Sequence, residues 1–161
     1  MRPTRDGTFM AMAIVLAIRG TCDRKQVGAL IVRDGRIIGM GYNGAPPGLP
    51  HCDENNHGYD SVPHGPDHPP EVMSLAGCRN ATHAEANALA FSAKYGVSTD
   101  EATLYVTLSP CLDCSRLLIA AGIRRVVYGE TYRDASGLDI LYQTGVELVD
   151  LGIPEPTRPS G

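Results

Sequence analysis

Residues 103–128 read TLYVTLSPCLDCSRLLIAAGIRRVVY, and this stretch contains one complete strand–helix–strand pattern. Residues 103–108 are predicted to form a strand. Pro110 is well suited to begin a helix, which we expect to continue as far as Gly122. Residues 125–128 are the next predicted strand. A helical crossover between two strands predicts parallel pairing with a right-handed connection.

Further elements precede and follow this unit. Asp34-Gly35 is a strong hairpin signal between predicted strands. In chain order we expect a helix over 9–19 capped by Thr8, strands over 27–33 and 36–42, a helix from about 82 to 96, a helix over 134–144 and a strand over 146–149. This order predicts an α/β fold, namely a three-layer α/β/α sandwich with a mixed sheet of about five strands and helices on both faces.

The chain of 161 residues is long enough for one domain with a substantial core, which we place at residues 1–153. Regular pattern disappears from 43 to 77, a segment rich in Pro, Gly and His. A loop of this length is unusual in a compact domain, so it is a functional loop, a metal-stapled loop or a disordered one. The Pro-containing tail over 154–161 is expected to be loose.

Composition limits the class of protein. Apolar residues make up 43% of the chain, charged residues make up 20%, and the formal net charge is −4. These values are ordinary for a globular protein, and they give no broad basic face for duplex nucleic acid or a membrane surface. A small anionic substrate is compatible with them, because a few local Arg or Lys side chains can hold one phosphate.

Cysteine content and the first apolar run indicate the compartment. There are five cysteines, and two of them form a C-x-x-C pair, which suits metal or redox chemistry in a reducing cytoplasm. The apolar run at 10–18 follows Arg2 and Arg5, as in a signal peptide. However, Asp6 lies in the would-be leader and no small-x-small cleavage site follows. We therefore expect a buried first helix, apolar nearly all round and packed on more than one side.

The residues that carry chemistry are His83-Ala84-Glu85 and Cys111-x-x-Cys114. One imidazole and two thiolates can hold a zinc ion and leave its fourth position open for water. Each pair is expected in the first turn of a helix, where positive potential favours thiolates. Glu85, which is not a ligand in this reading, can then carry protons to and from the substrate.

Other readings of these motifs exist. C-x-x-C alone could be half of a structural zinc site or a redox pair, and H-x-E alone is common by chance. A structural site normally closes with a fourth protein ligand, and Glu85 would then be incidental. Both motifs together, at the starts of two helices in one α/β unit, favour a catalytic zinc site.

With these residues in place, the sequence resembles the zinc-dependent cytidine-deaminase-like superfamily and, within it, the deoxycytidylate (dCMP) deaminases. The resemblance runs from the first helix to about Tyr132. Besides the zinc motifs, it rests on Thr21-Cys22-Asp23-Arg24, Val27-Gly28-Ala29, Gly41-Tyr42-Asn43-Gly44, Pro47-Gly48, His51-Cys52, Cys78-Arg79 and Leu104-Tyr105-Val106-Thr107.

The resemblance implies hydrolytic deamination of dCMP to dUMP and ammonia by a zinc-activated water, with Glu85 as proton shuttle, as a supply for dTMP synthesis. Alternative substrates are a 5-substituted dCMP, a nucleoside or a free base. A tRNA substrate is disfavoured, because the chain has no basic tail or stripe. A non-catalytic nucleotide-binding protein is a further alternative, although neither binding nor zinc retention would require Glu85.

Substrate contacts also follow from the resemblance. Asn43 matches the residue that hydrogen-bonds the sugar, although Tyr-Asn-Gly is also good turn chemistry. Arg24, together with Lys25, is a candidate for the phosphate; the alternative is an ordinary exposed Arg. Ala84 and Tyr132 are the other expected substrate contacts, with the Tyr132 hydroxyl directed to the phosphate.

A second, structural zinc that staples the long loop is also implied. Cys22, Cys52 and Cys78 are its candidate ligands, and the alternative is three free buried cysteines. The fourth ligand would come from the loop histidines His51, His57, His64 and His68. Relatives place further histidines just before the catalytic one, whereas this chain has Arg79, Asn80, Ala81 and Thr82 there.

Assembly and regulation complete the expectation. The resemblance implies a homo-oligomer, commonly a hexamer, with the first helix and Phe91 as natural subunit contacts. It also implies activation by dCTP and inhibition by dTTP, with Mg²⁺ accompanying the nucleotide effector. The expected effector loop contains Gly41, Tyr42, Gly44 and Gly48. Ser109 differs from many relatives, and together with the long insert it leaves regulation open.

Overall fold

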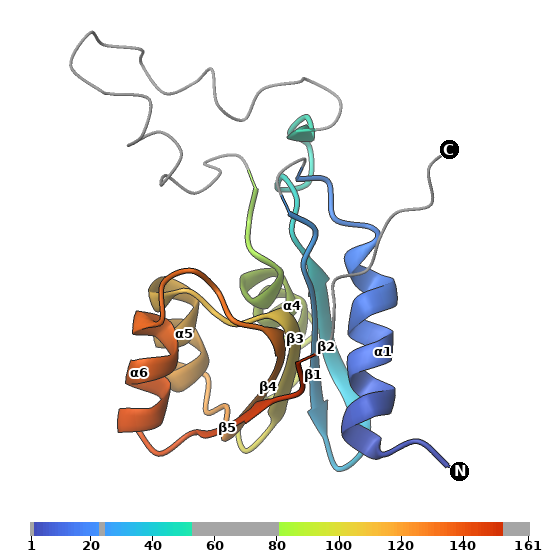
Figure 1. Cartoon of the computed structure of the whole chain (residues 1–161). Helices are drawn as coiled ribbons and strands as arrows, with labels where there is room; N and C mark the ends of the chain where they lie inside the picture. The colour runs from blue at the N-terminus through green and yellow to red at the C-terminus, as the bar shows by residue number, and fades with distance from the viewer. Residues whose placement is uncertain (1, 23–24, 53–80, 153–161) are drawn as a thin grey trace, which may run out of the picture.

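The computed structural model describes residues 2–22, 25–52 and 81–152. Its helices and strands follow the chain in the order shown in Figure 1: α1 (Arg5–Ala17), β1 (Gly28–Arg33), β2 (Arg36–Tyr42), α4 (Ala84–Lys94), β3 (Thr103–Leu108), α5 (Leu112–Ala120), β4 (Arg125–Glu130), α6 (Ser136–Gln143) and β5 (Glu147–Asp150).

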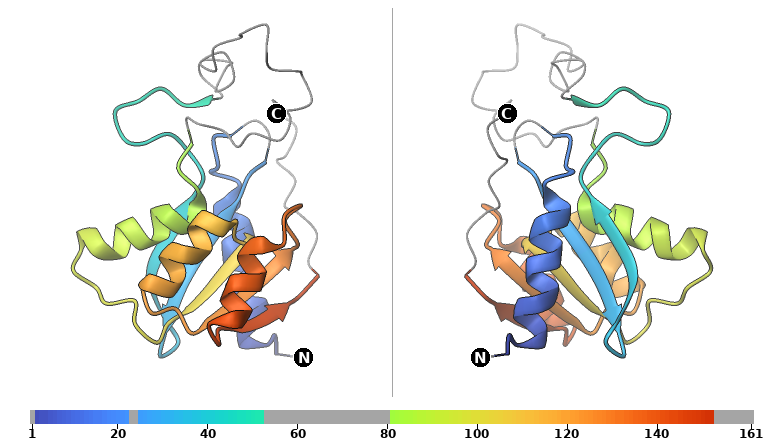
Figure 2. Two further views of the ribbon diagram at one scale, coloured as in Figure 1. Left: turned by 90° about the vertical axis from the view of Figure 1, so that its left-hand side faces the viewer. Right: turned by 90° about the vertical axis from the view of Figure 1, so that its right-hand side faces the viewer.

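The five strands form one sheet in the order β2-β1-β3-β4-β5. β1 pairs antiparallel with both β2 and β3, whereas β3, β4 and β5 are mutually parallel neighbours. Helix α1 lies on one face of the sheet, and α4, α5 and α6 lie on the other (Figure 1; Figure 2). The predicted three-layer α/β/α sandwich, its mixed sheet and its parallel portion are therefore confirmed.

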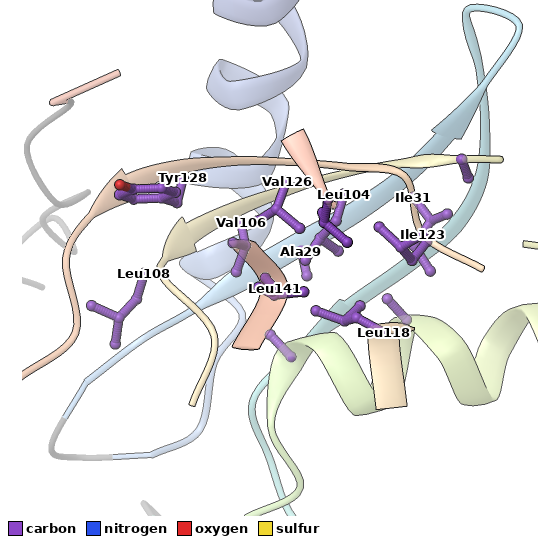
Figure 3. Packing of buried hydrophobic residues seen from close by; sticks show 14 of the residues in the cluster. Ala29, Ile31, Leu104, Val106, Leu108, Leu118, Ile123, Val126, Tyr128 and Leu141 are labelled. Carbon is purple, nitrogen blue, oxygen red and sulfur yellow. The ribbon is translucent and has the colours of Figure 1, made fainter. Parts of the chain in front are cut away.

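Alternation along the strands divides the core into two layers, because successive side chains of a strand point to opposite faces. The layer under α1 consists of Met10, Ala13, Leu30, Val32, Tyr105 and Val127. The larger layer, on the other face, includes the strand residues Ala29, Ile31, Leu104, Val106 and Val126. Figure 3 shows these strand side chains close to Leu118 of α5 and Leu141 of α6. Burial on both faces fixes the register of the central strands.

Glycines allow the helices to approach the sheet closely. A methyl group added at Gly41 would overlap the Ala84 carbonyl oxygen and the Ala88 nitrogen of α4. One added at Gly28 would overlap backbone atoms of α1. Gly41 therefore has a packing role that its place in the predicted effector loop did not suggest. Its lack of a side chain allows α4, the helix that follows His83, to pack closely against β2.

Helix α1 begins four residues earlier than the sequence predicted. Thr4, not Thr8, is the N-cap, and its hydroxyl accepts a hydrogen bond from the Gly7 backbone N–H at 3.0 Å. The Thr8 hydroxyl instead donates to the Thr4 carbonyl oxygen one turn back. A threonine hydroxyl can accept a hydrogen bond from the first turn of a helix or donate one to a carbonyl oxygen one turn back. The residue at which the helix begins therefore decides whether Thr4 or Thr8 is the N-cap.

The expected packing of α1 on more than one side is not seen in the single chain. Met10, Ala13 and Ala17 are buried against the sheet, whereas Met12 and Val15 are 44% and 66% exposed. These two exposed side chains line a groove of about 580 Å³ together with Ile37 and Met40 of β2. The apolar second face of the helix is therefore part of a continuous exposed apolar surface.

An ion-pair network joins the start of α1 to the sheet. The Arg125 guanidinium donates to both Asp6 carboxylate oxygens, at 2.9 and 2.7 Å, and the Tyr105 hydroxyl donates to the same carboxylate at 2.8 Å. These hydrogen bonds, above all those from Arg125, lower the pKa of Asp6. A bidentate pair of this kind, only 24% and 27% exposed, restrains geometry better than an exposed ion pair does.

Replacing Asp6 by Asn is expected to lower the free energy of unfolding by about 1–2 kcal/mol. Because the pKa of Asp6 is lower in the folded protein, its contribution is complete above about pH 4, the value for an unfolded aspartate, and is lost as the pH falls further. Urea unfolding of both proteins between pH 3 and 8 measures this. Glu101→Gln removes an exposed pair with Arg124 and should change stability by less than 0.5 kcal/mol. A pH-independent difference for Asp6→Asn would contradict this account.

None of the helices within the described residues is long and apolar enough to cross a membrane. The described residues include the start of the predicted loop, as far as Cys52, and the end of that loop and the tail over 154–161 lie outside them.

Candidate active site

Two helix starts bring the predicted chemistry together. His83 is the N-cap of α4 and Cys111 is the N-cap of α5, so Glu85 and Cys114 lie in the first turns of these helices. The cysteines follow the carboxyl end of β3, a central strand of the sheet. In parallel α/β units, residues that follow the strand ends collect at one edge of the sheet, which is where ligands bind.

The three predicted metal ligands lie together. Nδ1 of His83 is 3.5 Å from Sγ of Cys111 and 3.5 Å from Sγ of Cys114. Ligand atoms about 2.1 Å (nitrogen) and 2.3 Å (sulfur) from one tetrahedral ion lie about 3.6 Å apart. Among the residues that the structure describes, this is the one cluster of three His, Cys or acidic side chains suited to a metal. Its donors and their spacing fit zinc.

Electrostatics at the two sulfurs support the same conclusion. A hydrogen bond from Cys114, assisted by one from His83, lowers the pKa of the Cys111 thiol to about 4. The pKa of the Cys114 thiol is raised, chiefly because it shares its proton with the neighbouring Cys111 sulfur, and burial adds to this. A cation bound between the two sulfurs would favour their thiolate forms.

Glu85 has the environment of a proton carrier. Its side chain is 4% exposed. Burial raises the pKa of its carboxyl to about 7, although its own backbone hydrogen bond and the nearby His83 oppose this rise. A carboxyl with a pKa near neutrality can both accept and release a proton at physiological pH.

A pocket of about 140 Å³ lies beside the cluster. Its lining combines His83, Cys111 and Glu85 with other polar or cationic side chains. Its lining residues are Cys22, Lys25, Val27, Asn43, Ala81, His83, Ala84, Glu85, Leu108, Ser109, Cys111, Tyr132 and Arg133. The sequence-predicted substrate residues Asn43, Ala84 and Tyr132 are therefore all at this pocket.

Asn43 has a structural role that the sequence did not reveal. Its side-chain oxygen accepts a hydrogen bond from the Val27 backbone N–H at 2.8 Å, and its side-chain nitrogen donates to the Lys25 carbonyl oxygen at 2.6 Å. The amide thus fixes the segment entering β1 against the end of β2. The side-chain oxygen of Asn43 can accept one further hydrogen bond, and its side-chain nitrogen can donate one more. The sugar contact expected from the sequence stays a prediction.

The phosphate and second-zinc residues fall partly outside the description. Arg24, Cys78, His57, His64 and His68 lie outside the described residues. Lys25 is at the pocket, where its ammonium pairs with Glu130 at 2.9 Å. Cys22 and Cys52 are both buried, and Nδ1 of His51 lies 3.0 Å from the Thr21 hydroxyl. Within the described residues these three candidate ligands form no second metal cluster.

Two polar pocket residues were missed as contacts by the sequence analysis, namely Ser109 and Arg133. Ser109 follows the last residue of β3, and Arg133 follows β4 by three positions. Polar residues just beyond the ends of neighbouring parallel strands are the signal that could have identified both.

Comparison with known proteins agrees with this geometry. Residues 3–130 match the family described as the cytidine and deoxycytidylate deaminase zinc-binding region. The chain is 34% identical to the deoxycytidylate deaminase of Enterobacteria phage T2, over 89% of this chain and 90% of that protein. It is 41% identical to ComE operon protein 2 of Bacillus subtilis (strain 168), over 91% of this chain and 71% of that protein.

Among solved structures, the fold is similar to that of the dCMP deaminase from the cyanophage S-TIM5 in complex with dCMP and dUMP. The TM-score is 0.75 at 32% identity, and the match covers 94% of this chain and 99% of that one. The family match and the fold similarity both cover most of this chain, and the family's zinc-binding chemistry agrees with the cluster of His83, Cys111 and Cys114. This chain is therefore a member of the zinc-binding cytidine and deoxycytidylate deaminase family.

Proposed function

We propose that this protein catalyses the hydrolytic deamination of dCMP to dUMP and ammonia. The observation that carries this proposal is the buried Glu85 beside the His83, Cys111 and Cys114 cluster, in a pocket that also has cationic residues. The deoxycytidylate deaminases among its relatives and the dCMP-bound cyanophage enzyme support the choice of substrate.

In this proposal His83, Cys111 and Cys114 hold one zinc ion. When bound, zinc supplies Lewis-acid chemistry that lowers the pKa of a water molecule from about 15.7 towards neutrality. Glu85 accepts a proton from that water and delivers it to the ring nitrogen beside C4 of the cytosine. It then carries the second proton to the departing amine. A C–O bond replaces the C–N bond at C4, and ammonia leaves.

The amino acids around Glu85 suit this work. Ala84 is buried and Leu108 is 9% exposed, and both line the pocket. Such apolar walls limit the access of bulk water and keep the pKa of Glu85 close to neutrality. Cys22, Cys111 and Cys114 are not in disulfides, which is compatible with the reducing cytoplasm that the cysteine content predicts.

A substrate panel tests the function. Ammonia release should be fastest with dCMP, compared with CMP, deoxycytidine, cytosine and 5-substituted dCMP at equal concentrations. Faster turnover of deoxycytidine or cytosine than of dCMP would overturn the proposal. Zinc determination on the same sample separates one ion per chain from two, the second being held by Cys22, Cys52, Cys78 and a loop histidine.

Regulation by dCTP and dTTP with Mg²⁺ belongs to the same proposal. Its support is a short backbone connection between the predicted effector loop and the catalytic helix. Gly44 and Thr82 exchange two backbone hydrogen bonds, at 3.2 and 2.8 Å, directly before His83. A nucleotide bound at Gly41–Gly48 would therefore act on the helix start that carries His83. Repeating the panel with each effector tests this.

Assembly into a homo-oligomer, with a hexamer favoured, is supported by the groove between α1 and β2. Met12, Val15, Ile37 and Met40 expose apolar surface there, which an identical subunit would cover. Val15→Asp is expected to shift the protein towards smaller species in light scattering at equal concentration. Asp139→Asn, on α6, should leave the mass unchanged. An unchanged mass for Val15→Asp would rule out this face as the subunit contact.

A further inference from the structure

The metal ligand at the start of α4 does not cap its own helix. His83 has the extended backbone of an N-cap residue (φ −66°, ψ 152°), but within the described helix its side chain makes no capping hydrogen bond. Its Nδ1 instead lies 3.5 Å from the sulfurs of Cys111 and Cys114. An N-cap side chain normally bonds a free backbone N–H and so fixes the first turn. Other contacts must therefore hold this helix start.

Asn87, one turn into α4, supplies such contacts. Its backbone N–H donates to the His83 carbonyl oxygen at 2.9 Å. Its side-chain nitrogen donates to the carbonyl oxygen of Tyr42 at 2.8 Å and to that of Thr82 at 3.4 Å. Both partners only accept hydrogen bonds, so the amide nitrogen, with its two hydrogens, must face them. Asn87 thus bonds the metal ligand, the residue before it and the sheet.

The sheet gives these hydrogen bonds a fixed support. Tyr42 is the last residue of β2, which pairs with β1. Just beyond it, Gly44 exchanges two backbone hydrogen bonds with Thr82, at 3.2 and 2.8 Å. Thr82 is therefore held both by the Gly44 backbone and by Asn87. The two cysteine ligands follow β3 of the same sheet, so fixing the start of α4 on β2 also fixes His83 relative to the sulfurs.

Ser92 makes a second link of the same kind, farther from the metal ligands. Its hydroxyl donates to the Ile38 carbonyl oxygen at 2.9 Å, so it also joins α4 to β2, and Ser92 is 1% exposed. At 1.5 Å per residue, Ser92 lies about 14 Å along the helix from His83. The two links tie the same helix to the same strand, and they differ in their distance from the metal centre.

We propose that Asn87 is a positioning residue for the metal centre. Its side-chain amide holds the backbone on either side of the His83 peptide against the end of β2, so that the imidazole meets the two sulfurs. This inference rests on the proposed zinc site. Groups that orient metal ligands from behind typically contribute 10- to 100-fold to metal affinity. Asn87 is therefore assigned to zinc retention, and its contact is with the protein backbone.

Transfer of zinc from the loaded enzyme to a chromogenic chelator tests the inference. Ammonia release from dCMP is followed in the same titration, so the ion that is counted is the one on which turnover depends. Asn87→Ala is expected to raise the zinc dissociation constant by about 10- to 100-fold. Ser92→Ala is the matched control, because it removes a hydrogen bond between the same two elements. Its melting temperature should fall, with the zinc dissociation constant within about threefold of the wild type.

Asn87→Asp separates positioning from general stability. Aspartate keeps the shape of the side chain, but its carboxylate cannot donate to the two carbonyl oxygens. A negative charge in the first turn favours a helix and attracts a cation, so a merely structural role would leave zinc binding unchanged or stronger. The inference predicts weaker zinc binding, and this variant carries the test if Asn87→Ala does not fold.

Two results would overturn the inference and leave the proposed function intact. One is an unchanged zinc dissociation constant in the Asn87 variants. The other is an equal rise in Ser92→Ala, which would show that any loosening of α4 releases the metal. A wild-type protein that binds no zinc and releases no ammonia from dCMP would overturn the proposed function as well.

Discussion

Glu85→Gln is expected to reduce kcat for dCMP deamination by about 100- to 10,000-fold, the usual contribution of a positioned acid–base group. The substitution keeps the size of the side chain and removes its ability to carry a proton. Zinc content should not change, because the metal-binding cluster consists of His83, Cys111 and Cys114. Initial rates of ammonia release and metal determination on the same preparation measure both quantities.

The stability of this variant gives a second test. Glu85 is 4% exposed and its pKa is raised to about 7 by burial, so the folded protein bears a cost for holding the ionised carboxylate. Gln carries no charge, and Glu85→Gln should therefore unfold at the same temperature as the wild type or at a higher one at pH 8. Loss of activity with gain of stability is typical of a functional residue.

The exposed Glu101→Gln variant is the control for this experiment, since Glu101 is 65% exposed in its pair with Arg124. It should keep the wild-type kcat. If Glu85→Gln kept kcat within tenfold of the wild type, Glu85 would not be the proton carrier. If it lost zinc instead, the carboxylate would have a role at the metal.

Much of the fold could be predicted because its elements are encoded locally. The Asp34-Gly35 turn and the boundaries of β2 and β3 follow from short patterns, and both agree with the structure. The cysteine and histidine motifs also needed only local spacing plus the expectation that two helix starts are neighbours. Their 3.5 Å separations bear out that expectation.

What the sequence could not show are contacts between distant segments. Asp6 and Arg125 are 119 positions apart, and no periodicity relates them. The start of α1 depended on which of two threonine hydroxyls meets a free backbone N–H, which requires the folded turn. The hydrogen bond between Ser109 and Tyr132 required the β3–β4 register, because it appears only where that pairing ends.

Removing one metal ligand is expected to have an effect at least as large as removing the proton carrier. Cys114 is 4% exposed, and its sulfur lies 3.5 Å from Nδ1 of His83. Serine is a poor replacement, because a hydroxyl is far harder to ionise than a thiol and is not among the usual protein ligands of zinc. Cys114→Ser should therefore lose one zinc ion per chain and deaminate dCMP more than 1,000-fold more slowly, a loss in the range that metal activation of water supplies.

Thermal unfolding with and without a chelator separates loss of the metal from damage to the fold. A ligand that binds only the folded state stabilises it by mass action, so chelation should lower the melting temperature of the wild type. Cys114→Ser has already lost this site, and the chelator should lower its melting temperature less. Asp113→Asn changes the same motif at a side chain that is 87% exposed, and it should keep both zinc and turnover. Equal chelator shifts in wild type and Cys114→Ser, together with retained turnover, would show that this cysteine holds no metal needed for catalysis.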